Sequence, residues 1–220
     1  MTLHLFGSAS LFFVAVFMIR EFVALRRIRK LKYLFTPLVT IAVIFIPMIA
    51  IGEAGLTPYN SFITCALLLA LSGDTLLMVE ETDLLKPGML FFLGCHVLYA
   101  AAFAVKYSFR QWNIILLVVL ALTAVFHVKR LSRTAGKMTI PVAVYVTAIT
   151  VMIFLAIAQL NNGFTEGAVM AAVGAVLFGI SDYVHSVNNF VRKIENSTVY
   201  TWLFYAPAQF LIAASTLSVF

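Results

Sequence analysis

Charged side chains are scarce in this sequence. Only 11% of its 220 residues are Asp, Glu, Lys or Arg, whereas a soluble globular domain carries about 25%. Hydrophobic residues make up 63% of the chain, so its surroundings are expected to be lipid rather than water. Because a membrane-spanning helix needs about 20 apolar residues, the length allows eight short spans and leaves no room for a separate soluble domain.

Cysteines and the sequence motifs of soluble enzymes are also few or absent. The two cysteines, Cys65 and Cys95, fall inside apolar runs and predict no disulfide framework. The sequence has no Walker loop, no CxxC and no HExxH, and the run Gly179 to Tyr183 departs from the G-x-S-x-G elbow at its last position. The net charge of +6 predicts no nucleic-acid partner, because the basic residues lie in short connections between apolar runs.

Apolar runs dominate what is present. The predicted fold class is all-α: a polytopic membrane helix bundle with eight transmembrane helices that form a single transmembrane domain over residues 1–220. Pro37 and Pro141, like several other features, recur about 104 to 108 positions apart, which favours a parallel repeat of 1–110 and 111–220; the alternative is chance recurrence among eight similar helices. The eight predicted spans cover residues 3–20, 34–51, 57–79, 87–105, 112–127, 138–160, 165–187 and 198–219.

The basic residues predict the orientation in the membrane. Thirteen of the 15 Lys and Arg fall in the first, third, fifth and seventh connections, and only Lys106 and Arg110 fall on the other side. The positive-inside rule therefore places these connections in the cytoplasm and both termini outside it. We expect an integral, multi-pass protein of a bacterial cytoplasmic membrane. Arg20 directly follows the apolar stretch from Leu3 to Ile19, and we expect it to form an interfacial ion pair with Glu21.

Two aspartates lie inside predicted spans. Asp74 and Asp182 are each about one turn from the cytoplasmic end of a helix, and since both helices run in the same direction, the two carboxylates are expected at one depth and on one site. An uncompensated charge there costs about 2.5 to 3.5 kcal/mol, so the pair predicts a functional role. Each lies beside a row of small residues that is typical of a helix packing face. These rows are Ala66, Ala70 and Gly73, and Gly167, Ala171, Ala175 and Gly179.

Other polar side chains are predicted in the same half of the membrane. His96 and Tyr99 share one helical face with Phe92 and Phe103, at i, i+4, i+7 and i+11. The candidate site thus combines polar groups from five helices, the further ones being Tyr145, Tyr205 and Gln209.

A metal site is an alternative for some of these residues. Asp182 and His185 have the spacing of one helical turn, and Asp74 and His96 would complete a ligand set. The sequence does not bring these four side chains together, and we predict neither a metal nor a cofactor.

Five ordered segments resemble the motifs of the YhhN family of integral membrane proteins, from the second predicted helix to the eighth. They are Gly73 to Leu77, Phe92 to Tyr99, Pro141 to Tyr145, Gly174 to Asp182 and Tyr205 to Gln209. The resemblance implies a lysoplasmalogenase-like, eight-span enzyme that hydrolyses the vinyl ether bond of a lysophospholipid substrate, a choline or ethanolamine lysoplasmalogen, to a fatty aldehyde and a glycerophospho-base. It implies that Asp74 and Asp182 are catalytic. The residues implied to bind substrate or support catalysis are His96, Tyr99, Tyr145, Ser181, Tyr205 and Gln209.

The sequence departs from the family pattern at two positions. Thr36 precedes Pro37 where the family often has Lys, so a lysine role in head-group binding does not carry over. His185 stands where the family usually has an apolar residue, which argues against an obligatory metal ligand there.

Vinyl ether hydrolysis needs one protonated acid and one anion, and a pair of buried carboxylates supplies both, because burial and a nearby second carboxylate favour the protonated form of one of them. The basic residues Lys86, Arg130 and Arg192 are candidates to bind the substrate phosphate.

Two other functions fit the same residues. A proton-coupled transporter or carrier would use the aspartates as a proton relay, and a structural or regulatory lipid-binding protein would need no chemistry.

Overall fold

The chain folds into a helical bundle. A computed structural model describes residues 2–79 and 81–217, and this part of the chain contains helices and no β-strand, so the predicted all-α class is confirmed. The α-helices are α1 (Thr2–Leu25), α2 (Arg29–Ala54), α3 (Pro58–Leu77), α4 (Leu85–Ala104), α5 (Trp112–Ala135), α6 (Thr139–Ala158), α7 (Glu166–Phe190) and α8 (Ser197–Ala214), with the short 3-10 helices η1 (Gly136–Met138) and η2 (Gln159–Asn162).

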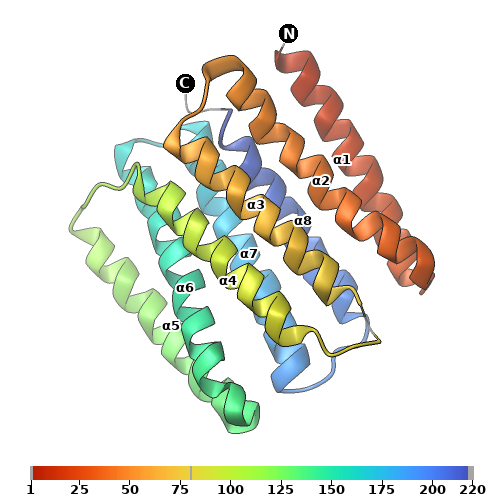
Figure 1. The fold of residues 1–220 in the computed structure, drawn as a ribbon. Helices are drawn as coiled ribbons and strands as arrows, with labels where there is room; N and C mark the ends of the chain where they lie inside the picture. The colour runs from red at the N-terminus through yellow and green to blue at the C-terminus, as the bar shows by residue number, and fades with distance from the viewer. Residues whose placement is uncertain (1, 80, 218–220) are drawn as a thin grey trace.

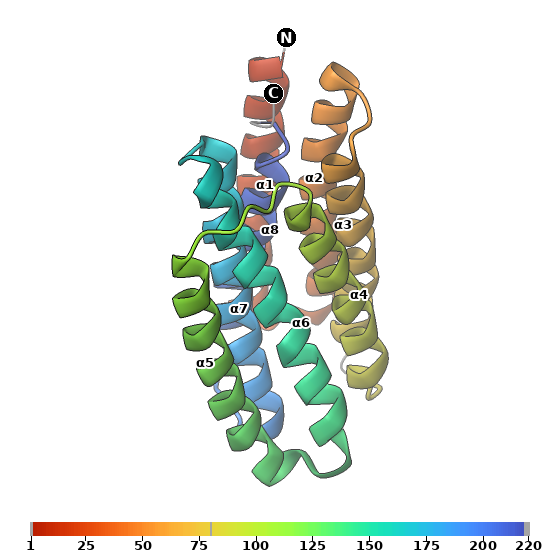
Figure 2. The same cartoon turned by 90° about the vertical axis from the view of Figure 1, so that its left-hand side faces the viewer.

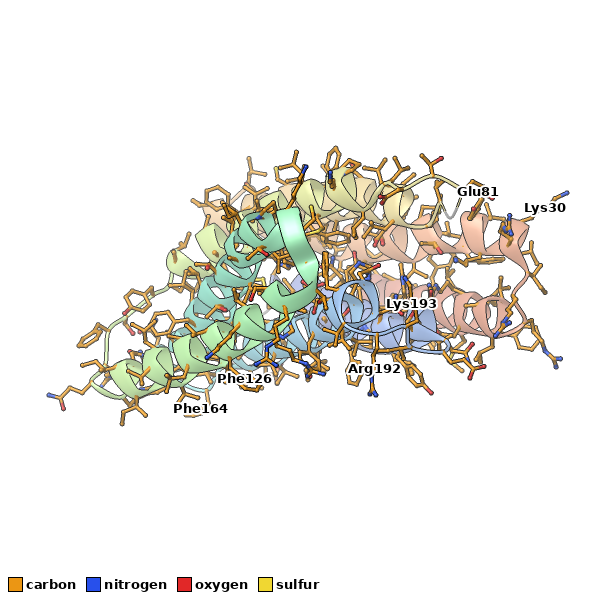
Figure 3. All side chains as sticks on the ribbon, turned by 90° about the horizontal axis from the view of Figure 1, so that it is seen from below. Lys30, Glu81, Phe126, Phe164, Arg192 and Lys193 are labelled. Atoms are coloured by element: carbon orange, nitrogen blue, oxygen red, sulfur yellow. The ribbon has the colours of Figure 1, made fainter. Side chains whose placement is uncertain are left out.

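Consecutive helices run in opposite directions (Figure 1), so α1 begins and α8 ends at the same end of the bundle. Helices α1 and α5 lie at opposite edges, and α5 and α6 form an antiparallel hairpin at one side (Figure 2). The connections that are rich in Lys and Arg lie together at the other end, which faces the viewer in Figure 3, where Lys30 points away from the bundle.

Several helices are long and apolar enough to cross a membrane. The described residues contain six such segments, and one of them, Trp112–Asn162, has 51 residues and includes both α5 and α6. The chain turns back between these two helices at Gly136, whose φ of +53° suits a residue without a side chain. Helix α8 is not among the six. The helices therefore indicate a multi-pass membrane protein, while eight crossings, the orientation of the termini and the four-plus-four repeat stay predictions.

Three helices are longer than predicted by more than one turn at their basic ends. Helix α1 continues to Leu25, α2 already begins at Arg29, and α5 continues to Ala135. The first connection is therefore a tight turn, in which Arg27 has a φ of +55°. Lys and Arg residues can remain part of a helix at a membrane boundary, because the apolar stems of their side chains pack along the helix while the charged ends reach water. Arg20 consequently lies inside α1 and not in the connection where the sequence placed it.

Capping residues in the sequence determine where two of the helices begin. The Thr57 hydroxyl accepts a hydrogen bond from the Asn60 backbone, the Asn60 side chain accepts one from the Thr57 backbone, and Pro58 occupies the first helical position of α3. The Thr165 hydroxyl caps α7 in the same way by accepting from the Ala168 N–H.

Small residues let the helices around the core approach closely. A Cβ atom on Gly174 of α7 would lie 2.9 Å from the Ala208 carbonyl oxygen and 2.8 Å from the Ile212 side chain of α8. The predicted packing rows are confirmed by burial, except that Gly179 is half-buried beside the Ile153 side chain. The buried members are Ala66, Ala70 and Gly73 on α3, and Gly167, Ala171 and Ala175 on α7.

Candidate active site

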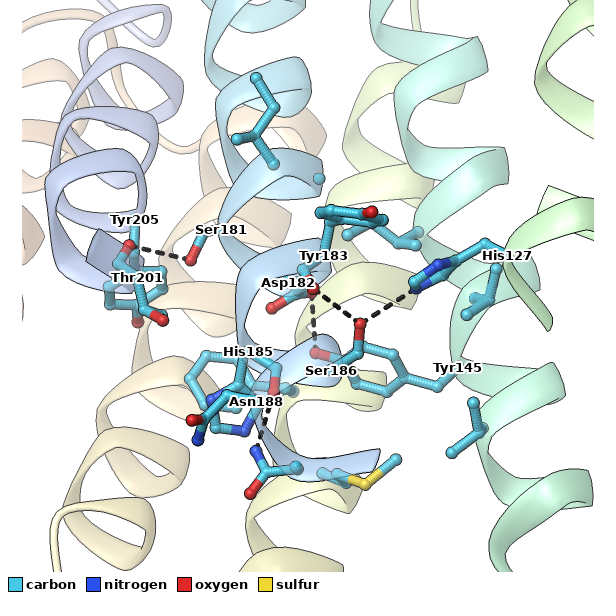
Figure 4. Close-up of a pocket in the computed structure, with 18 of the residues that line it drawn as sticks. His127, Tyr145, Ser181, Asp182, Tyr183, His185, Ser186, Asn188, Thr201 and Tyr205 are labelled. Carbon is cyan, nitrogen blue, oxygen red and sulfur yellow. Dashed lines mark hydrogen bonds between the residues drawn. The ribbon is translucent and has the colours of Figure 1, made fainter. Parts of the chain in front are cut away.

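A cavity of about 1000 Å³ opens in the half of the bundle nearest the basic connections. All eight helices contribute side chains to its wall, and α5 and α6 supply an apolar surface that includes Phe126, Val146 and Ile149. Both candidate carboxylates, Asp74 and Asp182, line this one cavity. Its volume is in the range of sites that hold a small molecule with mostly apolar surface. Figure 4 shows a part of the wall, with labelled residues from α5, α6, α7 and α8.

Asp182 belongs to a hydrogen-bonded group from three helices. Its Oδ2 atom accepts a hydrogen bond of 2.9 Å from the Tyr145 hydroxyl of α6 (Figure 4) and lies 3.0 Å from Nε2 of His96 on α4. The His96 side chain is fully buried, whereas the Asp182 side chain is 17% exposed. One carboxylate oxygen is therefore in contact with both an imidazole and a phenol.

Asp74 belongs to a second group, which is buried throughout. Its Oδ2 atom accepts hydrogen bonds of 2.5 Å from the Thr40 hydroxyl of α2 and 2.8 Å from the Tyr205 hydroxyl of α8. The Gln209 amide donates to the Tyr205 oxygen at 2.9 Å, and the Tyr99 hydroxyl of α4 donates to the Gln209 carbonyl. Two hydroxyl groups thus contact the Asp74 carboxyl group, whereas an imidazole and a phenol contact that of Asp182.

Aromatic rings lie between the two groups. The Phe178 ring is 4.7 Å from the His96 ring and 5.3 Å from the Tyr205 ring, centre to centre, and Phe92 packs edge-on against both Phe178 and Tyr205. The structure therefore brings the two aspartates to one cavity, but no side chain donates a hydrogen bond to both of them among the described residues.

The remaining predicted site residue, Ser181, also lines the cavity. Its hydroxyl donates to the backbone carbonyl of Thr201 on α8 at 3.1 Å (Figure 4), so it joins α7 to α8 and belongs to neither aspartate group.

Arg20 is fully buried and lines the cavity, although the sequence indicated an interfacial residue. The predicted ion pair with Glu21 is confirmed, with 2.5 Å between Arg20 Nη1 and Glu21 Oε1. The predicted position was wrong because α1 continues past Arg20 and the guanidinium packs on the Trp202 ring of α8, with Cζ 4.2 Å from the ring centre.

The sequence did not reveal several other polar residues of the site. Thr40, the closest donor to Asp74, stands in an apolar helix, and its only signal is the i, i+4 spacing from Thr36 on the same face. A further group lies on α5 and α7, where the His127 ring contacts the Ser186 hydroxyl at 3.0 Å and Arg130 donates to Tyr183 at 2.8 Å.

The sequence left a metal site as an alternative, which would need at least three ligand side chains close together. Among the residues that the structure describes, no three or more His, Cys, Asp or Glu side chains are placed to hold a metal ion. Asp74, His96, Asp182 and His185 therefore do not form such a group.

The model of the YhhN family matches residues 31–216, which is most of the chain. The chain belongs to the YhhN family. A bovine (Bos taurus) relative, named lysoplasmalogenase TMEM86A, is 30% identical over 163 residues, which cover 72% of this chain and 66% of the relative. Human (Homo sapiens) lysoplasmalogenase TMEM86B is 29% identical over 159 residues, covering 72% of this chain and 65% of the relative.

A shorter match comes from a bacterium. A Mycobacterium bovis protein named lysoplasmalogenase is 38% identical over 79 residues, covering 36% of this chain and 28% of the relative. The matched part of this YhhN chain thus spans just under two thirds of the two mammalian relatives. No solved structure matches the chain at a significant level.

Proposed function

We propose that this YhhN protein is a membrane lysoplasmalogenase, a hydrolase that cleaves the vinyl ether bond of a choline or ethanolamine lysoplasmalogen. The observation that carries the proposal is the position of two carboxylates, Asp74 and Asp182, on different helices at one cavity of about 1000 Å³. The names of the relatives, lysoplasmalogenase in both mammals and mycobacteria, support the same activity.

The proposal includes the arrangement in the membrane. All eight helices cross the bilayer as one domain, since the segment Trp112–Asn162 is more than twice as long as one span needs and reverses direction at Gly136. The basic connections face the cytoplasm and both termini lie outside it. The relatives come from mammals and from mycobacteria, and the bacterial cytoplasmic membrane stays a prediction.

The shape of the cavity suits a lipid with one chain. Apolar side chains of α5 and α6, Phe126 and Ile149 among them, provide a wall for the alkenyl chain, while Asp74 and Asp182 lie at the polar part of the same space. The exposed surface of α5 is also apolar, with Leu122 65% and Phe126 71% exposed, so a lipid could approach from the bilayer.

The reaction starts with a proton transfer from a carboxylic acid to the β-carbon of the vinyl ether. This transfer leaves an oxocarbenium ion, in which the ether oxygen shares the positive charge. Water adds to the α-carbon and loses a proton to the second carboxylate, which gives a hemiacetal. The hemiacetal hydroxyl then gives its proton to the first carboxylate as the C–O bond to glycerol breaks, and the second carboxyl group returns its proton to the glycerol oxygen. A fatty aldehyde and a glycerophospho-base are released, and both carboxyl groups are back in their starting states.

The two networks suggest how the aspartates divide this work. Asp182, with His96 at 3.0 Å and Tyr145 at 2.9 Å from one oxygen, is the ionised group that stabilises the cation and takes the proton from water. Asp74, which is buried and has only hydroxyl donors, is the acid that delivers the proton to carbon. Tyr205 and Gln209 hold Asp74 in place, and Tyr99 holds Gln209.

The deciding experiment incubates the purified protein with a lysoplasmalogen in D₂O. We expect release of a fatty aldehyde that carries one deuterium on the carbon next to the carbonyl, because that carbon received the proton. Asp74→Asn and Asp182→Asn should each abolish turnover in a folded protein, whereas Glu166→Gln, the same change at an exposed position of α7, should leave it intact.

Three results would contradict the proposal in different ways. Proton movement across liposomes on addition of substrate, without any aldehyde, would identify a transporter. Release of a fatty acid from an ester lysolipid would identify a lysophospholipase. Full activity of either Asn variant would remove that aspartate from the mechanism.

A further inference from the structure

The guanidinium of Arg20 is buried with one edge unused. Its Nη1 atom binds Glu21 Oε1 at 2.5 Å. Its Nε and Nη2 atoms, in contrast, are buried and have no hydrogen-bond partner among the described residues. These two N–H groups lie on the same edge of the planar guanidinium, and this is the edge that binds two oxygens of a phosphate or carboxylate at once.

A buried cationic donor without an acceptor is unfavourable, and such a group is normally paired. Arg20 is nevertheless held firmly in this position, because Glu21 binds one side of the guanidinium and the Trp202 ring covers its face at 4.2 Å. The arrangement is that of a preformed anion site whose ligand is absent from the chain itself.

Arg20 belongs to the wall of the same cavity as Asp74. Arg20 and Thr36 both line that cavity, and the Thr36 hydroxyl is a second buried group without a partner among the described residues. Lys32, one turn before Thr36 on α2, also lines the cavity and adds positive charge. A ligand on Arg20 would therefore occupy the same cavity as the proposed acid, Asp74.

We propose that Arg20, together with the Thr36 hydroxyl, binds the phosphate group of the lysolipid. This inference rests on the proposed function and adds its head-group site. The three-carbon glycerol unit separates the phosphate from the vinyl ether, so a phosphate at Arg20 brings the ether towards Asp74. This site differs from the basic residues that the sequence suggested for the phosphate, of which Arg130 instead donates to Tyr183 at 2.8 Å.

The first test compares two substrates with the same alkenyl chain, a lysoplasmalogen and a 1-alkenylglycerol that lacks the phosphate. Arg20→Gln should raise KM for the lysoplasmalogen at least tenfold, and the loss of kcat/KM should be several times larger for the lysoplasmalogen than for the alkenylglycerol, which has no phosphate to lose. Arg20→Lys keeps the charge but loses the two-point contact, and should give a smaller increase. Arg133→Gln, the same change at an exposed position of α5, should leave KM and kcat/KM unchanged for both substrates. Equal losses for both substrates in Arg20→Gln would show a structural role and overturn the proposal.

The second test measures binding without catalysis, so that it remains valid if the proposed function fails. Isothermal titration calorimetry would use a saturated 1-alkyl lysophospholipid and the matching 1-alkylglycerol. Arg20→Gln should weaken the binding of the lysophospholipid much more than that of the alkylglycerol. If Arg20→Gln does not fold, Thr36→Val serves instead and should weaken the same ligand to a smaller extent. Inorganic phosphate that binds as tightly as the lysolipid would indicate a site for the free ion, and unchanged lysolipid binding in the variants would also overturn the proposal.

Discussion

Gly73 makes room for an aromatic ring beside the proposed acid. A Cβ atom at this position would lie 2.7 Å from Cε2 and 2.8 Å from Cδ2 of Phe92, whereas carbon atoms in contact are normally about 3.5 to 4.0 Å apart. In Gly73→Ala the ring must therefore move by roughly 1 Å. It is confined by Phe178 and Tyr205, with ring centres 6.2 and 5.8 Å away, and the open direction is the cavity that Phe92 lines.

The expected cost follows from two opposing effects. Overpacking a core costs about 1 to 3 kcal/mol, and replacing Gly by Ala inside a helix returns about 0.8 to 1 kcal/mol. Gly73→Ala should therefore destabilise the protein by up to about 2 kcal/mol and reduce turnover, because Phe92 and Tyr205 are displaced next to Asp74. The free energy of unfolding in detergent and the rate of aldehyde release would be measured together.

Two control variants test whether the effect comes from the clash with Phe92. Gly52→Ala changes a helical glycine of α2 that has no atom within 4 Å of the added Cβ, so it should be neutral or stabilising. Phe92→Leu provides space for the new methyl group, and the double variant with Gly73→Ala should be more stable than the sum of the single effects by about 0.5 kcal/mol or more. Additive effects, or a Gly73→Ala protein with the stability and activity of the unmodified chain, would refute the proposed clash.

Two further predictions concern hydroxyl groups. Tyr145→Phe removes a hydrogen-bond donor to Asp182 without leaving a cavity. Because a hydrogen bond to a charged group is worth about 1.5 to 3 kcal/mol, turnover in a steady-state assay should fall roughly 10- to 150-fold. Tyr107→Phe, the same change at a residue outside the cavity, should leave turnover unaffected. The Tyr33 hydroxyl, 2.6 Å from Glu81, lowers the pKa of that carboxyl group, so the contact stabilises the fold above the ordinary glutamate pKa and is lost as the pH falls through the lowered value. Tyr33→Phe should raise the pKa of Glu81 in an NMR titration, and an unchanged pKa would contradict this.

The sequence predicted the eight α-helices from their apolar runs. It also predicted that the candidate polar residues lie in one half of the bundle, because intramembrane polar residues are rare enough to stand out. Asp74 and Asp182 attract notice in apolar helices whatever their partners are. What the sequence did not reveal is which donor serves which carboxylate. That depends on how helices far apart in the chain pack, and Thr40 and Tyr205 meet Asp74 from α2 and α8.

Arg20 shows why the helix limits were harder to predict. A basic residue after an apolar run normally indicates a membrane boundary, and this pattern predicts that Arg20 lies in a connection. Its burial depends on Glu21 and on Trp202, which is distant in sequence. Only the packing of α1 against α8 brings the indole ring to the guanidinium, and no local pattern encodes that contact.

The two aspartate groups have a consequence for the assembly of the protein. Asp74 connects α2, α3 and α8, Asp182 connects α4, α6 and α7, and Tyr99 joins α4 to the first group through Gln209. In a bilayer, apolar surface gives little preference for one helix neighbour over another, and polar contacts select the partners. The side chains proposed for catalysis therefore also select the order in which six helices pack. Selection for catalysis and selection for correct assembly would act on the same few positions.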